Sequence, residues 1–183
     1  MEETKTKKFK TLDLAYTGLS VALLAVCSWI SIPLAVPITL QTLGVCLVAG
    51  LFGLKRGTVS LLAYILLGAV GVPLFSNFKG GIGVLLGSTG GYIIGFVFTS
   101  LIVGFACEKW RGKPWVTAVS MIVGVLVCYA FGTAWFALVY AKKNTPASLV
   151  TILGWCVFPF IPFDIIKIIV ASLLTKRLKR YVK

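Results

Sequence analysis

The sequence contains no histidine and few acidic residues. Its 183 residues include five aspartates and glutamates, and its five cysteines stand alone within apolar runs, without a C-x-x-C motif. Enzymes usually need a nucleophile with a neighbouring base, a metal cluster or paired carboxylates, so this composition argues against an enzyme. It argues equally against a zinc site and a disulfide framework, and we expect the cysteines to be small packing residues. A conducting channel is not indicated, because the sequence has no ring of charges and no repeated filter.

Long apolar runs dominate the chain instead. Hydrophobic residues make up 58% of it, charged residues 13%, and the mean hydropathy is +0.99, which exceeds the values of soluble domains. The runs approach or exceed the roughly 18 residues needed to cross a bilayer. The basic N-terminus is similar to that of a signal peptide, but the apolar run after it continues to Ile32 without an A-x-A-like cleavage site, so we interpret it as a retained first span. Residues 1–183 are therefore expected to form a single all-α transmembrane domain.

The distribution of positive charge predicts six transmembrane helices with both termini in the cytoplasm. Of the 18 lysines and arginines, fourteen fall in four clusters, namely Lys5–Lys10, Lys55–Arg56, Lys109–Lys113 and Lys176–Lys183. With six spans all four clusters lie on one side, which the positive-inside rule identifies as cytoplasmic, and Lys79, Lys142 and Lys143 lie on the other. Five spans would divide the clusters between the two faces. The six expected spans are Leu12–Ile32, Thr42–Leu54, Thr58–Val72, Thr89–Cys107, Pro114–Tyr140 and Pro162–Thr175, with a short outer helix within residues 147–158.

The first span carries Ala15, Gly18, Ala22 and Ala25 at helical spacing, and small residues three or four apart allow another helix to approach closely. This face is expected either to pack inside the protein or to be a docking surface for a partner. Pro33 and Pro37 then end the helix and predict an extended, apolar outer loop that fits a lid over a pocket.

The second and third spans are short, and the turn between them is expected at Lys55–Gly57. Two short spans leave a depression at the outer surface. The glycine-rich segment from Pro73 to Tyr92 is expected to fill it, because glycines disfavour a regular helix and let backbone amides approach a ligand. The segment lacks the G-K-[ST] lysine of a phosphate loop. The alternative is a plain turn capped by Ser88 or Thr89 at the start of the fourth helix.

Asp164 and Lys167 place an acid and a base in the otherwise apolar segment from Pro159 to Lys167. Three positions apart on a helix, they share a face and can meet. Charges in such a setting are costly unless they are paired. The last helix is expected to begin near Pro162, so that Asp164 lies in its first turn, where the helix dipole favours a negative charge. The pair is either a polar ligand site in the outer half of the membrane or an ion pair that only orients helices.

Together these features predict a small outward-facing pocket with one anion, one cation, the amides of Asn77 and Gln41, and several backbone donors. Such a set fits a compact, partly apolar molecule with polar groups at its ends. The sequence has no ATP-binding motif, so active uptake would need a separate protein that supplies the energy. The alternative is a stand-alone secondary transporter of a small vitamin or organic anion, coupled to protons through Asp164, although the two halves show no convincing inverted repeat.

Four strings of residues point to a family. They are V-P-I-T-L-Q-T-L-G-V from Val36 to Val45, L-L-G-A-V-G-V-P-L-F, G-G-I-G-V-L-L-G-S-T-G-G-Y-I-I-G-F from Gly80 to Phe96, and P-F-I-P-F-D-I-I-K. With these strings the chain resembles BioY, the biotin-binding S component of energy-coupling factor (ECF) transporters, from about Leu12 to Leu178. The central glycine-rich string is the specific one.

The resemblance implies a six-helix S-component fold in the plasma membrane of a prokaryote, which binds biotin from outside with high affinity. It implies as partners a transmembrane coupling protein and two ATP-hydrolysing subunits, with the S component toppling in the membrane to release biotin inward; it implies no cofactor. The ureido ring, thioether ring and carboxylate tail of biotin agree with the mixed pocket expected above. The implied ligand-binding residues are Gln41, Asn77, Gly83, Gly87, Gly90, Tyr92, Asp164 and Lys167, and the implied docking residues are Gly18, Ala22 and Ala25.

Overall fold

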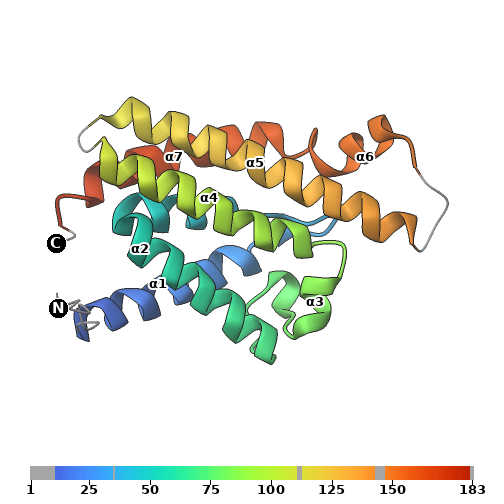
Figure 1. The fold of residues 1–183 in the computed structure, drawn as a ribbon, viewed down its shortest axis with the longest axis horizontal. Helices are drawn as coiled ribbons and strands as arrows, with labels where there is room; N and C mark the ends of the chain where they lie inside the picture. Colours follow the sequence, from blue (N-terminus) through green and yellow to red (C-terminus); the bar gives the residue numbers. More distant parts are fainter. Residues whose placement is uncertain (1–10, 35, 111–112, 143–146, 182–183) are drawn as a thin grey trace, which may run out of the picture.

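The computed structural model describes residues 11–34, 36–110, 113–142 and 147–181. Among these residues, seven α-helices pack along one another, and α1 begins at the same end of the molecule at which α7 ends (Figure 1). The basic cluster Lys5–Lys10 lies outside the described residues, as do Arg111, Lys143 and Lys183. The α-helices are α1 (Thr11–Trp29), α2 (Gln41–Val70), α3 (Ile82–Leu86), α4 (Gly90–Lys109), α5 (Pro114–Ala141), α6 (Leu149–Cys156) and α7 (Ile161–Leu178).

Four of these helices, α1, α2, α4 and α5, are long and apolar enough to cross a membrane. The pair α6 and α7 passes the same test as one span that is bent by 43°. By length and composition the described chain is therefore an all-α membrane protein with four to five candidate spans, fewer than the six expected. The difference arises at α2, which counts once although its backbone is broken in the middle.

The break in α2 lies at Gly53, whose φ of 76° and ψ of −167° are angles that glycine alone adopts readily. A Cβ built on Gly57 would lie 3.0 Å from the Cα of Ala49, whereas eight residues of a straight helix span about 12 Å. Residues 41–52 and 54–70 are therefore two short helical segments that fold back on each other (Figure 1). The expected turn at Lys55–Gly57 is wrong, because the chain reverses at Gly53 and those three residues already belong to the second segment.

Glu108, near the end of α4, closes this turn. Its Oε1 accepts a hydrogen bond of 2.9 Å from the N–H of Leu54, the first residue after the break. That N–H begins a helical segment and has no carbonyl partner one turn earlier. A side chain of α4 therefore satisfies the exposed start of the second segment of α2.

Glycines let α4 lie close to both α2 and α5. A Cβ on Gly104 would lie 2.7 Å from the Cα of Leu54, and one on Gly124 would lie 3.2 Å from the Cα of Thr99. Small residues at such crossings are the usual means by which membrane helices pack. The hydroxyl of Thr99 also donates to the carbonyl of Gly124 (2.8 Å). All five cysteines are buried with free thiols, as expected of packing residues.

The loops at the end of the molecule opposite the start of α1 carry little regular structure. The segment after α1 is extended, as the prolines predict, and forms a short antiparallel pair, β1 (Ser31–Ile32) with β2 (Ile38–Thr39). The segment between α2 and α4 contains the 3₁₀ helix η1 (Ser76–Phe78) and α3. The five-residue helix α3 corrects the expectation that glycines prevent a helix here. Thr89 precedes α4 without a side-chain capping bond, so the capped-turn alternative is not supported by its hydroxyl.

The last span begins as the sequence predicts. Pro162 stands in the first turn of α7, and Asp164 is the acidic residue of that turn. The helix runs on to Leu178, beyond the expected end at Thr175, because the basic residues Lys176 and Arg177 suit the C-terminal end of a helix dipole. The expected short outer helix is α6, whose N-cap Ser148 accepts from the N–H of Thr151 (3.3 Å).

Candidate functional site

A cavity of about 440 Å³ lies beneath the loops that join α1 to α2 and α2 to α4. Its volume lies within the range of typical small-molecule sites. Five of its walls' side chains are aromatic, and charged groups occur at Lys79, Asp164 and Lys167. The lining residues are Leu34, Val36, Pro37, Thr39, Gln41, Thr42, Phe75, Ser76, Asn77, Lys79, Gly83, Val84, Gly87, Ser88, Thr89, Tyr92, Ile93, Phe96, Val125, Cys128, Tyr129, Phe160, Asp164 and Lys167.

Asp164 and Lys167 form a buried ion pair in the wall of this cavity. The Nζ of Lys167 lies 2.7 Å from the Oδ1 of Asp164, and the residues are 5% and 3% exposed. The other carboxylate oxygen accepts a hydrogen bond from the hydroxyl of Tyr129 on α5. Because the two residues are three positions apart on α7, the helix itself brings them together. Each oxygen keeps a lone pair, and the ammonium keeps two N–H donors for which no described residue provides an acceptor.

Gln41 stands at the start of α2 and is 5% exposed. Its Nε2 donates to the hydroxyl of Tyr64 (3.0 Å), which in turn donates to the carbonyl of Leu74 (2.9 Å). The first and second segments of α2 are thus joined to the loop that follows them. This chain of bonds occupies one donor of the Gln41 amide and fixes its orientation beside the cavity.

Asn77 lies in a loop that is held by α1. Asn77 and Phe78 both have left-handed backbone, with φ of 59° and 56°, which is unfavourable for a bulky residue such as phenylalanine. The ring of Phe78 stacks on Trp29 at 4.9 Å, and the indole N–H of Trp29 donates to the carbonyl of Pro73 (2.9 Å). The Oδ1 of Asn77 accepts from the hydroxyl of Ser31 (3.2 Å). These contacts stabilise the loop in the shape that lines the cavity.

The glycines expected at the site have different roles. Gly83 and Gly87 line the cavity, whereas Gly90 does not. A Cβ on Gly90 would lie 1.7 Å from the carbonyl oxygen of Leu85, so this glycine lets α4 begin against α3. Tyr92 lines the cavity, and its hydroxyl donates to the carbonyl of Cys156 (3.1 Å) and accepts from the hydroxyl of Thr133 (3.2 Å).

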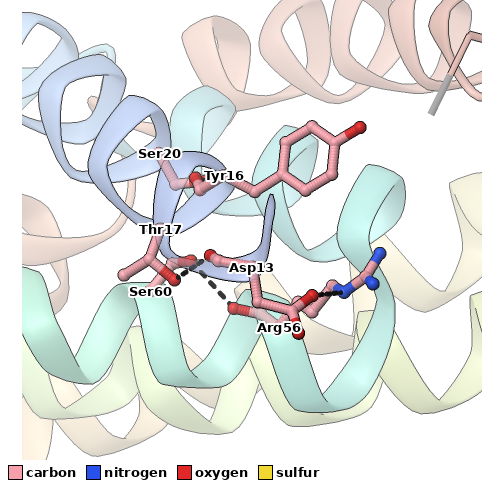
Figure 2. Close-up of polar contacts among 6 residues, drawn as sticks. All are labelled: Asp13, Tyr16, Thr17, Ser20, Arg56 and Ser60. Atoms are coloured by element: carbon pink, nitrogen blue, oxygen red, sulfur yellow. Dashed lines mark hydrogen bonds and ion pairs between the residues drawn. The ribbon is translucent and has the colours of Figure 1, made fainter. Parts of the chain in front are cut away.

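A second polar cluster lies at the opposite end of α1, away from the cavity (Figure 2). Arg56, in the second segment of α2, forms an ion pair with Asp13 of α1 (2.7 Å), and its guanidinium lies 5.7 Å from the ring centroid of Tyr16. The hydroxyls of Thr17 and Ser60 donate to carbonyls four residues earlier in their own helices. The ion pair therefore links α1 to α2, while the hydroxyls are satisfied locally.

Comparison with known proteins assigns the family. Residues 2–183 match the model of the BioY family. The biotin transporter BioY of Thermotoga maritima is 42% identical over 169 residues, which are 92% of this chain and 96% of that protein. The probable biotin transporter BioY of Pyrococcus horikoshii is 39% identical over 171 residues, 93% of this chain and 98% of that protein. This chain belongs to the BioY family.

A solved structure agrees with this assignment. The crystal structure of the S-component for biotin from an ECF-type ABC transporter is 29% identical to the chain and superposes with a TM-score of 0.80. The match covers 92% of this chain and 91% of that one. The BioY-family chain therefore has the S-component fold.

The small residues Gly18, Ala22 and Ala25 lie on two different faces of α1. Ala25 is 3% exposed and belongs to the core. Gly18 and Ala22 are exposed, and a Cβ on Gly18 would meet no atom within 4 Å. Ala25 therefore packs inside the protein, which was one of the two alternatives for this face. Gly18 and Ala22 face away from the described chain.

The sequence did not predict several residues that line the cavity. Tyr129, which bonds to Asp164, comes from α5 and stands 35 positions earlier in the chain. The sequence predicts Lys79 on the outer side but not at the site, and Phe160 is not among the predicted site residues, although both line the cavity. A buried tyrosine in an apolar helix does need a partner for its hydroxyl, and this was the available signal for Tyr129.

Proposed function

We propose that this BioY-family chain is the membrane subunit that binds biotin for uptake and works with an ATP-driven energy-coupling module. The observation that carries the proposal is the cavity with the buried Asp164–Lys167 pair in its wall. The names of the relatives and the similarity to an S-component for biotin support it. A biotin-sized molecule with polar groups at both ends suits a cavity of about 440 Å³ that is lined by a buried charge pair and by the exposed Lys79.

The geometry supports one orientation of biotin. An N–H of the cyclic urea would donate to Asp164, and the urea carbonyl would accept from the free N–H donors of Lys167. The apolar thioether ring would lie against Phe75, Phe96 and Phe160, which line the cavity. The carboxylate tail would then extend toward Lys79, which is exposed and lines the same cavity. Gln41, Asn77, Gly83, Gly87 and Tyr92 remain ligand-contact residues in this proposal; Gly90 supports the loop.

The charge of the tail offers a test of this orientation. Lys79→Gln should weaken biotin binding by up to about fivefold, because an exposed ion pair contributes little more. The same substitution should leave the affinity for biotin methyl ester unchanged, since the ester has no charge to pair. Equal losses for the acid and the ester would contradict the orientation.

The proposal includes six spans with both termini in the cytoplasm. The two segments of α2 would each cross part of the membrane, and α6 would lie at the outer surface before α7. One end of the described bundle carries three polar contacts: Asp13 pairs with Arg56, Glu108 accepts from the N–H of Leu54, and Lys179 donates to the carbonyl of Cys107. The positive-inside rule would place this end in the cytoplasm. The exposed face with Gly18 and Ala22 would contact the transmembrane coupling protein, which two ATPase subunits would energise.

The experiment that tests the function is calorimetric titration of the purified chain in detergent. Biotin is the ligand, with thiamine and riboflavin as controls. We expect tight one-to-one binding of biotin and no heat from the controls. Binding of another vitamin, or of none, would overturn the proposal and favour a proton-coupled carrier of a different molecule.

A further inference from the structure

The last turns of α7 form a basic pocket on the surface, beyond the part of the helix that lines the cavity. A depression there is lined by Leu173, Lys176, Arg177 and Arg180, and we call these four residues the basic pocket. Three of the four carry a positive charge, and all four are exposed. The end of α7 lies at the end of the molecule where α1 begins (Figure 1).

The charges of the basic pocket are not neutralised within the part of the chain that the structure describes. None of its three cations forms an ion pair there. The neighbouring Lys179 is used differently, since its Nζ donates to the carbonyl of Cys107 at the end of α4 (3.1 Å). The nearby acid Glu108 accepts from the N–H of Leu54. An anionic ligand at the basic pocket would therefore meet no competing acid of the described chain.

The exposed face of α7 continues from the basic pocket as an apolar stripe. Ile166, Ile169 and Leu173 are 62%, 54% and 56% exposed and follow one another at spacings of three and four residues. Lys176 and Arg180 extend the same spacing. An apolar stripe that ends in several cations matches a molecule with long hydrocarbon chains and an anionic head.

We propose that the basic pocket binds the phosphate of an anionic phospholipid whose acyl chains lie along the Ile166–Leu173 stripe. Clusters of lysine and arginine directly beyond a membrane helix attract anionic lipids, and arginine suits the oxygens of a phosphate. A free phosphate would use the cations but not the stripe. The lipid site is separate from the biotin cavity and does not depend on the function proposed for that cavity.

The test uses the full chain in a maltoside detergent, with lipid binding read by native mass spectrometry. Dioleoyl phosphatidylglycerol is the anionic probe, dioleoyl phosphatidylcholine the zwitterionic one, and glycerol phosphate the head without chains. The variant is Lys176→Gln with Arg180→Gln. The matched control is Lys109→Gln with Lys113→Gln, which removes two charges at the same end of the bundle but outside the pocket.

We expect one phosphatidylglycerol to bind in preference to phosphatidylcholine, and the pocket variant to weaken it roughly thirtyfold. The control variant should keep wild-type lipid affinity, and glycerol phosphate should not displace the lipid. Equal losses in both variants would show a diffuse charge effect and overturn the proposal. Displacement by glycerol phosphate would assign the pocket to a free phosphate, and equal binding of both lipids would remove the role of charge. The unfolding midpoint of each sample, and the single substitutions, separate lost binding from lost folding.

Discussion

Asp164 is held by side chains from two helices, Lys167 on α7 and Tyr129 on α5, and the energetics of this arrangement support the proposal that the buried pair binds the ligand. A buried ion pair loses about as much in desolvation as it gains in attraction. Its removal in favour of apolar residues is often neutral for folding, so stability alone does not account for it. The remaining lone pairs of Asp164 and the free donors of Lys167 line the cavity, where they match a urea group.

Asp164→Asn should reduce biotin affinity more than roughly 100-fold. Loss of the charge leaves Lys167 buried without its partner, which destabilises the fold by about 3–5 kcal/mol. Affinity falls because the new amide brings donors to a position where the ligand needs an acceptor. Calorimetric titration measures the change. Asp13→Asn is the matched control, because it breaks the ion pair with Arg56 at the other end of α1. Wild-type affinity in Asp164→Asn would refute the role of the carboxylate.

Tyr129→Phe isolates what the hydrogen bond from Tyr129 to Asp164 contributes to biotin affinity. A hydrogen bond to a charged group is worth about 1.5–3 kcal/mol, so we expect biotin affinity to fall by about 10- to 100-fold. Tyr140→Phe, in the same helix, is the control, since its ring packs on Phe136 and its hydroxyl makes no hydrogen bond within the described chain. The two variants are compared by titration with biotin. A similar affinity for both would mean that Tyr129 only fills space.

Local spacing decided which residues of the site could be predicted. Asp164 and Lys167 were predictable because three positions on a helix determine their contact. Tyr129 was not, since its contact depends on how α5 packs on α7, and no pattern within α5 encodes that. Gly90 shows the limit of such patterns: glycine in a loop indicates close approach, and in the structure the carbonyl of Leu85 approaches it, while Gly90 does not line the cavity.

At the scale of elements, α1 and the loop after α2 work as one unit over the cavity. Trp29 joins them by stacking on Phe78 and by donating to Pro73. Prolines in the sequence predicted an extended segment after α1, and glycines predicted an irregular one after α2. The contact of Trp29 with the loop after α2 was not predictable. It depends on the reversal of α2 at Gly53, and the sequence alone did not locate that reversal.

Trp29→Ala should accelerate the release of biotin. The aromatic stacking and the hydrogen bond are each worth about 0.5–1.5 kcal/mol, and their loss lets the loop that carries Asn77 leave its left-handed conformation. The dissociation rate of labelled biotin, measured by chase with excess unlabelled biotin, should rise by roughly 5- to 100-fold. Trp115→Ala is the control, because Trp115 lies in the first turn of α5 and is 64% exposed. An unchanged rate in Trp29→Ala would show that the loop is held by other contacts.

The whole molecule separates three surfaces. The cavity lies under the loops at one end, the polar contacts of Asp13, Glu108 and Lys179 lie at the other, and Gly18 and Ala22 of α1 face outward along the side. Hydropathy and charge were sufficient to predict the membrane class and the long helices, but not the short helix α3. The number of spans remained ambiguous, since a helix that reverses at one glycine can be counted once or twice.

Gly18→Leu should therefore disrupt assembly without affecting biotin binding. No atom of the described chain lies within 4 Å of a Cβ at this position, and leucine is the better helix former by about 0.8 kcal/mol, so the fold should be retained. A coupling protein that needs close approach would be kept away by the larger side chain. Copurification with a tagged coupling protein and its ATPase subunits should fall sharply, while biotin titration stays at the wild-type value. Gly154→Leu, which also has open space around it, is the control. A wild-type yield of the complex from Gly18→Leu would place the docking surface elsewhere, and loss of biotin binding would instead mean that α1 supports the cavity through this face.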